Sequence, residues 1–222
     1  MVRLGVLLLS LALLLAGCGE DDDETAATPT PGAAASETGC EEVEAPEPKG
    51  EGDLPRPREQ LERGTTYVAT VATSCGDFEI TLDPRDAPRT GGSFKSLADE
   101  GFYDGITFHR IAAGFVVQGG DPQGNGQGGP GYSIVEAPPE DLVYENGVVA
   151  MAKTAIEEPG TSGSQFFVVT AEDAQLPPEY ALLGRVTAGM EVVDRIAAVE
   201  TDPATEMPVS PVVIESVSVE ER

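Results

Sequence analysis

The side chains best suited to chemistry lie together in residues 108–121, FHRIAAGFVVQGGD. This stretch contains the only histidine of the chain, His109, with Arg110 and Gln118, and it lacks serine, cysteine and lysine. A serine or cysteine hydrolase needs a nucleophile beside a base, usually histidine. The strand pattern here predicts that the side chains of His109 and Arg110 point to opposite faces. The segment GTSGSQ also lacks the G-x-S-x-G spacing at Ser162, so we expect no catalytic triad.

Metal and nucleotide sites are disfavoured as well. One histidine and two cysteines that an oxidising compartment would pair give no cluster of metal ligands. Gly124, Gly126 and Gly129 satisfy the pattern G-x-G-x-x-G, but that fingerprint must follow a strand and open a helix. Pro130 and Gly131 follow immediately and prevent a helix from starting. We therefore expect no metal and no cofactor, and we interpret this segment as an irregular loop that approaches something closely.

The elements that must position these residues begin near residue 65. Alternating apolar and polar residues over 67–82 predict two strands joined by a tight turn at 74–77. Helical spacing predicts helices over residues 88–100 and 190–199, although Gly91 and Gly92 are unfavourable inside the first. Six further strands are expected at residues 106–111, 115–120, 147–152, 164–170, 181–187 and 211–221. About eight strands and two helices indicate a mainly β protein, a closed antiparallel barrel capped by the helices.

Four motifs occur in an order typical of one family. FHRIAAGFVVQGGD, the glycine-rich loop, GVVAMAKT and GTSGSQFFVVT resemble the corresponding segments of cyclophilins, which are peptidyl-prolyl cis–trans isomerases. The resemblance covers about residues 66–220. It implies a closed eight-stranded antiparallel barrel with two capping helices, and it implies isomerase activity on X–Pro bonds.

That reaction explains why no nucleophile is needed. Rotation about the X–Pro bond faces a barrier of about 18–20 kcal/mol from amide resonance, and no other bond changes. An enzyme need only bind the twisted amide better than the planar one. The twisted proline nitrogen gains a localised lone pair, which a fixed donor stabilises. Arg110 matches the catalytic arginine of the family, and its guanidinium is a permanently charged fork of donors.

The resemblance also implies the remaining site residues. Gln118 matches the glutamine that holds the arginine and the substrate backbone, and Phe115 is placed with these two in the catalytic group. Substrate-binding positions are expected for an apolar socket, a backbone-binding segment and a neighbouring pocket. These residues are Val116, Gly126, Ala152, Lys153, Thr154, Gln165, Phe167, Leu176 and Tyr180.

Four positions depart from the family pattern. Val116 replaces a frequent methionine, and Lys153 replaces a frequent asparagine, which leaves main-chain contacts intact. Tyr180 stands at the active-site histidine position and keeps a ring with a polar tip. Gln175 stands where eukaryotic members carry the tryptophan that is important for cyclosporin, so we expect weak cyclosporin binding. The acidic loop at residues 155–160 is longer than usual and is expected to disfavour acidic peptides.

The N-terminus predicts export and lipid attachment. Arg3 precedes an apolar run over residues 4–17 that is short for a membrane span and typical of a signal peptide. The run ends in LAGC at residues 15–18, which resembles the bacterial lipoprotein signal. The resemblance implies that Cys18 is diacylated and becomes the first mature residue, with an extracytoplasmic location anchored to the cell membrane. An ordinary signal peptide with an incidental cysteine is the alternative.

The segment after the signal predicts a tether. Residues 19–63 are rich in Glu, Asp, Pro, Ala and Thr, and they contain too few apolar residues to offset the entropy of ordering. Cys40 and Cys75 are the remaining cysteines, and in an oxidising compartment we expect them to pair and to pin the end of the tether. We therefore divide the chain into a signal peptide (1–17), a tether (18–63) and an isomerase domain (64–222).

Charge and length limit the partners. The 222 residues suit one domain with extensions, and a formal net charge of −26 disfavours nucleic-acid binding. We expect a monomer that binds unfolded or flexible exported polypeptides containing proline, and that contacts the membrane through its lipid. The departures at Gln175 and Tyr180 leave a non-catalytic peptide-binding or chaperone lipoprotein as the alternative. A purely structural surface lipoprotein is a third reading.

Overall fold

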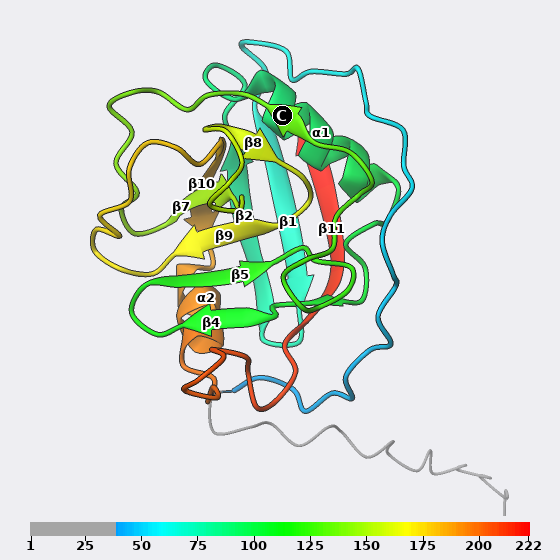
Figure 1. Cartoon of the computed structure of the whole chain (residues 1–222), viewed down its shortest axis with the longest axis vertical. Helices are drawn as coiled ribbons and strands as arrows, with labels where there is room; N and C mark the ends of the chain where they lie inside the picture. Colours follow the sequence, from blue (N-terminus) through cyan, green and yellow to red (C-terminus); the bar gives the residue numbers. More distant parts are fainter. Residues whose placement is uncertain (1–38) are drawn as a thin grey trace, which may run out of the picture. The chain divides into compact units, whose positions relative to one another are not determined.

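A computed structural model describes residues 39–222 (Figure 1). The predicted signal peptide, the lipidation site Cys18 and the first part of the tether lie outside these residues. The described elements are β1 (Tyr67–Thr73), β2 (Gly76–Leu82), α1 (Pro88–Asp99), β3 (Ile106–Thr107), β4 (Arg110–Ala112), β5 (Val116–Gly119), β6 (Ile134–Val135), β7 (Val148–Met151), β8 (Thr161–Ser162), β9 (Phe166–Val169), β10 (Leu182–Ala188), α2 (Met190–Ala197) and β11 (Val213–Glu221). Neither helix is long and apolar enough to cross a membrane, a statement that applies to this part of the chain.

Nine strands form one antiparallel sheet in the order β3-β11-β1-β2-β10-β7-β9-β5-β4, and β6 pairs with β8 in a separate small sheet. The edge strands β3 and β4 are joined through Phe108 and His109 alone, yet no ladder within residues 39–222 pairs them. The expected closed eight-stranded barrel is therefore corrected to a strongly curled, open sheet. The predicted strand over residues 106–111 is divided into β3 and β4, and the two-residue strands β6 and β8 are too short to give a sequence pattern.

The β1–β2 hairpin forms where the sequence predicts it. Its turn is stabilised by the Thr73 hydroxyl, which donates to the Gly76 carbonyl and accepts from the Cys75 amide. Gly76 has a φ of +109°, a backbone conformation that side chains disfavour. β1 then pairs with β11 along its length, so the first and last strands of the domain lie side by side near one edge of the sheet, next to β3.

The two faces of the sheet bury separate apolar clusters. On β5, Val117 belongs to the larger cluster, to which both helices contribute, whereas Val116 belongs to a smaller cluster. Because successive side chains of a strand point to opposite faces, Gln118 lies on the same face as Val116. Gln118, and Arg110 opposite it on β4, therefore lie on the face of the sheet opposite to the larger core.

Helix α1 contains two glycines where residues 59–61 cross it too closely for any side chain. A Cβ atom on Gly91 would collide with the side chain of Leu61, and one on Gly92 would collide with the backbone of Glu59. No side chain of the preceding residue caps this helix. Its first amides, those of Arg89 and Thr90, instead donate to the Glu136 carboxylate at 3.2 and 2.7 Å, which suits the positive end of a helix dipole.

Residues 40–64, which we call the strap, run along the edge of the domain from the disulfide to β1 (Figure 1, blue to cyan). Its backbone amides at Lys49, Gly52 and Leu54 donate to carbonyls of the glycine-rich segment at Pro122, Gly129 and Pro130, each at 2.9 Å. The Leu61 amide donates to the Pro88 carbonyl at 2.9 Å, and the Leu61 side chain is buried. This part of the sequence-defined tether is therefore held along the domain.

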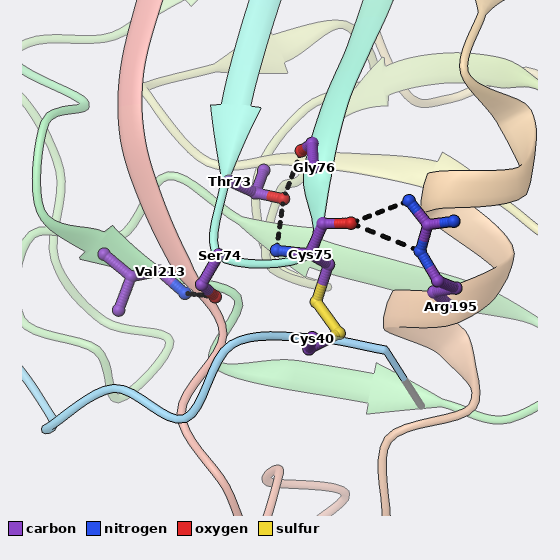
Figure 2. The surroundings of a disulfide bond; sticks show 7 residues. All are labelled: Cys40, Thr73, Ser74, Cys75, Gly76, Arg195 and Val213. Atoms are coloured by element: carbon purple, nitrogen blue, oxygen red, sulfur yellow. Dashed lines mark hydrogen bonds between the residues drawn. A yellow bond between two sulfur atoms is a disulfide. The ribbon is translucent and has the colours of Figure 1, made fainter. Parts of the chain in front are cut away.

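The predicted disulfide between Cys40 and Cys75 is present and joins the start of the strap to the β1–β2 turn (Figure 2). The Cys75 carbonyl accepts two hydrogen bonds from the guanidinium of Arg195 on α2, at 2.8 and 3.2 Å. The neighbouring Ser74 hydroxyl accepts the amide of Val213 on β11 at 3.1 Å. The turn that receives the strap is thus tied to both a helix and the C-terminal strand.

Candidate active site

Three neighbouring strands bring the candidate catalytic residues into one row. Arg110 of β4 lies opposite Gln118 of β5, and Gln118 lies opposite Phe167 of β9. Directly opposed residues of antiparallel strands share one face of the sheet. The tight turn between β4 and β5, in which Gly114 adopts a φ of +68°, is what places the two polar residues side by side.

A small pocket of about 170 Å³ opens beside this row. That volume is below the roughly 300–1,000 Å³ typical of sites for drug-sized ligands, and it suits a single side chain. Its lining is largely apolar or aromatic, with an arginine, a glutamine and a lysine at its polar parts. The lining residues are Arg110, Phe115, Val116, Gln118, Ala152, Lys153, Phe167, Leu176 and Tyr180.

Arg110 is held by contacts on two sides. Its Nε atom lies 2.7 Å from an Oε atom of Glu206, and its Nη1 atom lies 3.5 Å from the Gln118 side-chain oxygen. The centre of the guanidinium lies 6.0 Å from the ring centroid of Phe115, within the range of a cation–π contact. The arginine is thus fixed at the edge of the pocket.

Gln118 connects the arginine to a polar network. Its amide nitrogen donates to the Gln165 side-chain oxygen at 3.0 Å and lies 3.4 Å from Nε2 of His109. Gln165 in turn donates to the Gly128 carbonyl at 2.9 Å. These contacts set the orientation of the Gln118 amide, so that its oxygen faces the guanidinium.

His109 is buried, and it contacts Gln118 on the face that carries Arg110, although the strand pattern predicted that His109 would point to the opposite face. Only 6% of the residue is exposed, and no atom of residues 39–222 forms a hydrogen bond with its Nδ1. Burial lowers the pKa of this histidine, and the charge of Arg110 acts in the same direction against the opposing effect of Asp121. A neutral ring with an unprotonated Nε2 is the form that can accept the Gln118 amide hydrogen.

A second pocket of about 620 Å³ adjoins the first and shares Gln118, Ala152 and Lys153 with it. Its other lining includes Gly126, Thr154 and Gln165, and one residue of the strap, Glu51. The glycine-rich segment forms one wall of this pocket and therefore links the strap to the site.

The glycine-rich segment folds around one carboxylate. Asp121 is buried and accepts the backbone amides of Gln123, Asn125 and Gly126. A Cβ atom on Gly128 would collide with the same carboxylate. The close approach that the sequence predicted for this loop is therefore an approach to Asp121 on one side and to the strap on the other.

The opposite rim of the pockets is formed by Lys153 and its neighbours. The Lys153 side chain is 4% exposed, and its ammonium lies 3.6 Å from the Glu179 carboxylate and 5.5 Å from the Tyr180 ring centroid. The Glu157 carboxylate accepts both the amide and the hydroxyl of Thr154, at 2.6 and 2.8 Å. The lysine charge is therefore paired beside the pocket rather than directed freely into it.

Tyr180 is positioned through its backbone. The hydroxyl of Tyr144 donates to the Tyr180 carbonyl at 2.6 Å and accepts its amide at 3.0 Å. Burial raises the pKa of Tyr144 to about 12, so this phenol stays protonated and keeps its donor at neutral pH. The Tyr180 ring packs edge-on against Phe167, with ring centroids 5.5 Å apart, and closes one side of the first pocket.

All twelve site residues that the sequence predicts within the domain line one of these two pockets. Their individual roles stay predictions. Sequence reasoning missed two contacts, that of His109 with Gln118 and that of Glu206 with Arg110. Glu206 is separated from Arg110 by 96 positions and lies in an acidic loop, so nothing in the sequence connected it to the site.

Comparison with known proteins identifies the family. The model of the family described as cyclophilin type peptidyl-prolyl cis-trans isomerase/CLD matches residues 68–219. Peptidyl-prolyl cis-trans isomerase B of Streptomyces anulatus is 44% identical over 172 residues, which cover 69% of this chain and 97% of that protein. Peptidyl-prolyl cis-trans isomerase A of Mycobacterium tuberculosis is 36% identical over 172 residues, which cover 69% of this chain and 92% of that protein.

A solved structure agrees with these matches. The cyclophilin type isomerase of Cryptosporidium parvum superposes with a TM-score of 0.65 at 30% identity, covering 71% of this chain and 99% of that one. A second structure of that isomerase, determined in the presence of the dipeptide Ala-Pro, gives a TM-score of 0.65 at 28% identity. The match covers 70% of this chain and 99% of that one. The chain belongs to the cyclophilin family of peptidyl-prolyl cis–trans isomerases. The strap lies outside the matched residues.

Proposed function

We propose that this chain isomerises X–Pro bonds of exported polypeptides by stabilising the twisted amide with Arg110 over an apolar proline socket. The observation that carries the proposal is the fixed guanidinium at the edge of a pocket lined by Phe115, Phe167 and Leu176. A structure of the Cryptosporidium parvum isomerase was determined in the presence of the dipeptide Ala-Pro, which supports a proline-containing ligand for this chain as well.

The proposed reaction uses binding alone. The proline ring enters the socket, where apolar burial holds it while the preceding carbonyl rotates. As amide resonance is lost, the proline nitrogen becomes a better acceptor, and the Arg110 guanidinium donates to it. Gln118 holds the guanidinium on one side and stays within reach of the substrate backbone. No proton transfer, metal or covalent intermediate takes part in this scheme.

The decisive experiment is a cis–trans exchange assay on a panel of proline peptides, with Arg110→Ala as the test variant. We expect kcat/KM to fall by roughly 100-fold or more, the scale of removing one fixed donor from a transition state. Arg185→Ala is a matched control, because Arg185 also pairs with a glutamate, Glu145 at 2.9 Å, but lines neither pocket. Equal rates for Arg110→Ala and the native protein would rule out the mechanism.

The same exchange assay distinguishes an isomerase from the alternative, a non-catalytic peptide-binding or chaperone lipoprotein. A non-catalytic peptide-binding lipoprotein would suppress aggregation of an unfolded client without accelerating proline exchange. The departures at Tyr180 and Gln175 are the features that motivate it. Intact Arg110, Gln118 and Phe167 around one pocket favour the isomerase.

The proposed place of action is the outer side of a bacterial membrane, with the chain held by lipid on Cys18. The signal-like N-terminus and the disulfide support this placement. Labelled palmitate supplied to a bacterial host should enter the native chain and not a Cys18→Ala variant. Equal labelling of the two would overturn the lipid attachment.

A further inference from the structure

The catalytic arginine of this chain has a carboxylate partner outside the strands that form the site. Glu206 lies in the segment between α2 and β11, and its Oε2 atom is 2.7 Å from Nε of Arg110. The two side chains are 34% and 43% exposed. The pair is half-buried, and ion pairs that water still reaches contribute little to folding, so we sought another consequence of this contact.

The segment around Glu206 is built to present this side chain. Glu206 has a φ of +58°, which few residues other than glycine adopt. Its amide donates to the Asp202 carbonyl at 2.8 Å, and its carbonyl accepts the amide of Ile111, the residue after Arg110, at 2.8 Å. The Asp202 carboxylate also accepts the amide of Ala204 at 2.7 Å. A strained backbone that is fixed on both sides is a feature that concentrates at functional sites.

The remaining contacts show what the carboxylate does to the guanidinium. Glu206 engages Nε, and Gln118 lies beside Nη1. Within residues 39–222, Nη2 has no hydrogen-bond partner. Nε and Nη1 of the planar guanidinium are therefore held in place, and Nη2 is left to donate to the substrate.

We propose that Glu206 is a positioning residue that holds Arg110 in the orientation required for isomerisation, an inference that rests on the proposed function of Arg110. Without the carboxylate, the guanidinium would rotate about its own bonds and reach the substrate in fewer of its conformations. The loss would appear in kcat more than in KM, because the socket that binds the proline ring is unchanged.

Two substitutions separate the side chain from the backbone. Glu206→Gly removes the carboxylate at a position where glycine adopts the observed φ without strain. Glu206→Gln keeps the length and one acceptor oxygen but removes the charge. We expect about a tenfold fall in kcat for Glu206→Gly and a smaller fall for Glu206→Gln, with KM within about twofold of the native value. Glu145→Gln, which alters the matched pair with Arg185, should leave both constants unchanged.

A double-mutant cycle and a spectroscopic readout complete the test. In an Arg110→Ala background, Glu206→Gly should have no further effect, because the two residues act through one contact. The Nε–H resonance of Arg110 in NMR spectra should be protected from exchange in the native protein and lost in Glu206→Gly. Native kcat and an unchanged resonance in Glu206→Gly would overturn the inference. If the native protein itself is inactive, the proposed function fails instead, and the resonance still reports whether Glu206 fixes Arg110.

Discussion

Leu61 of the strap lies directly against Gly91 of α1, at a point where any side chain on the helix would collide with it. The contact explains why a glycine stands where helix propensity favours almost any other residue. It also shows that a polar, proline-rich segment contributes an apolar side chain to the main core of the domain.

Gly91→Ala is therefore expected to destabilise the domain. In an exposed helix the same change stabilises by about 1 kcal/mol, whereas here the added methyl group overpacks the contact at a cost of about 1–3 kcal/mol. Urea unfolding of the native protein and the variant gives the sign of the change in the free energy of unfolding. In a Leu61→Ala background, where the space is free, Gly91→Ala should become neutral or stabilising. A stabilised single variant would contradict the packing described for the strap.

His109 should make the stability depend on pH below neutrality. Burial lowers its pKa in the folded state, so the unfolded state, near the ordinary value of about 6.5, binds more protons between the two values. The free energy of unfolding should fall as the pH drops from about 6.5 through the folded-state pKa, and it should be unaffected by this group above that range.

His109→Gln should remove that dependence, because the chain has no other histidine. Urea unfolding of both proteins at several pH values from about 7.5 to 5 gives the comparison. Parallel stability curves for the two proteins over this range would show that His109 does not titrate as described.

The Cys40–Cys75 disulfide should stabilise the domain by about 4 kcal/mol in the chain-entropy model, given its sequence separation of 35 residues. The Cys40→Ser, Cys75→Ser double variant should lose that amount in unfolding experiments under oxidising conditions. Added reductant should lower the free energy of unfolding of the native protein to that of the double variant. A double variant that unfolds at the native denaturant concentration would show that the strap is held without the covalent bond.

Cyclosporin should bind weakly, with a Kd above about 1 μM. Gln175 stands at the position of the family tryptophan, lines neither pocket, and has a φ of +52°. Because a bulky side chain disfavours that conformation, Gln175→Trp alone should not restore tight binding. Titration calorimetry on the native protein and this variant checks both statements, and a sub-micromolar Kd for the native chain would refute the first.

The sequence predicted the parts of the fold that are regular. The β1–β2 hairpin, both helices and the row of Arg110, Gln118 and Phe167 follow from strand and helix periodicity and from the cyclophilin motifs. β6 and β8 escaped prediction because two residues define no period. The break at Phe108 and His109 also escaped, and with it the contact between His109 and Gln118, because strict alternation along a single strand was assumed.

The order of the strap and the role of Glu206 depend on contacts that are remote in sequence. Residues 40–64 read as a tether because their composition is polar, whereas their order comes from backbone bonds to the glycine-rich segment and from the space left by Gly91 and Gly92. Glu206 is 96 positions from Arg110 in the sequence, and only the tertiary structure brings the two side chains together. Local patterns carry no information about either arrangement.

The disulfide also determines where the domain would feel a mechanical load. Tension applied to the chain at residue 39 reaches the Cys40–Cys75 bond before it reaches the strap, and it passes directly into the β1–β2 turn (Figure 2). Arg195 and Val213 anchor that turn to α2 and β11. The hydrogen bonds between the strap and the wall of the second pocket lie off this path. A pull from the N-terminal side of the domain would therefore not load the hydrogen bonds that hold the strap against this pocket.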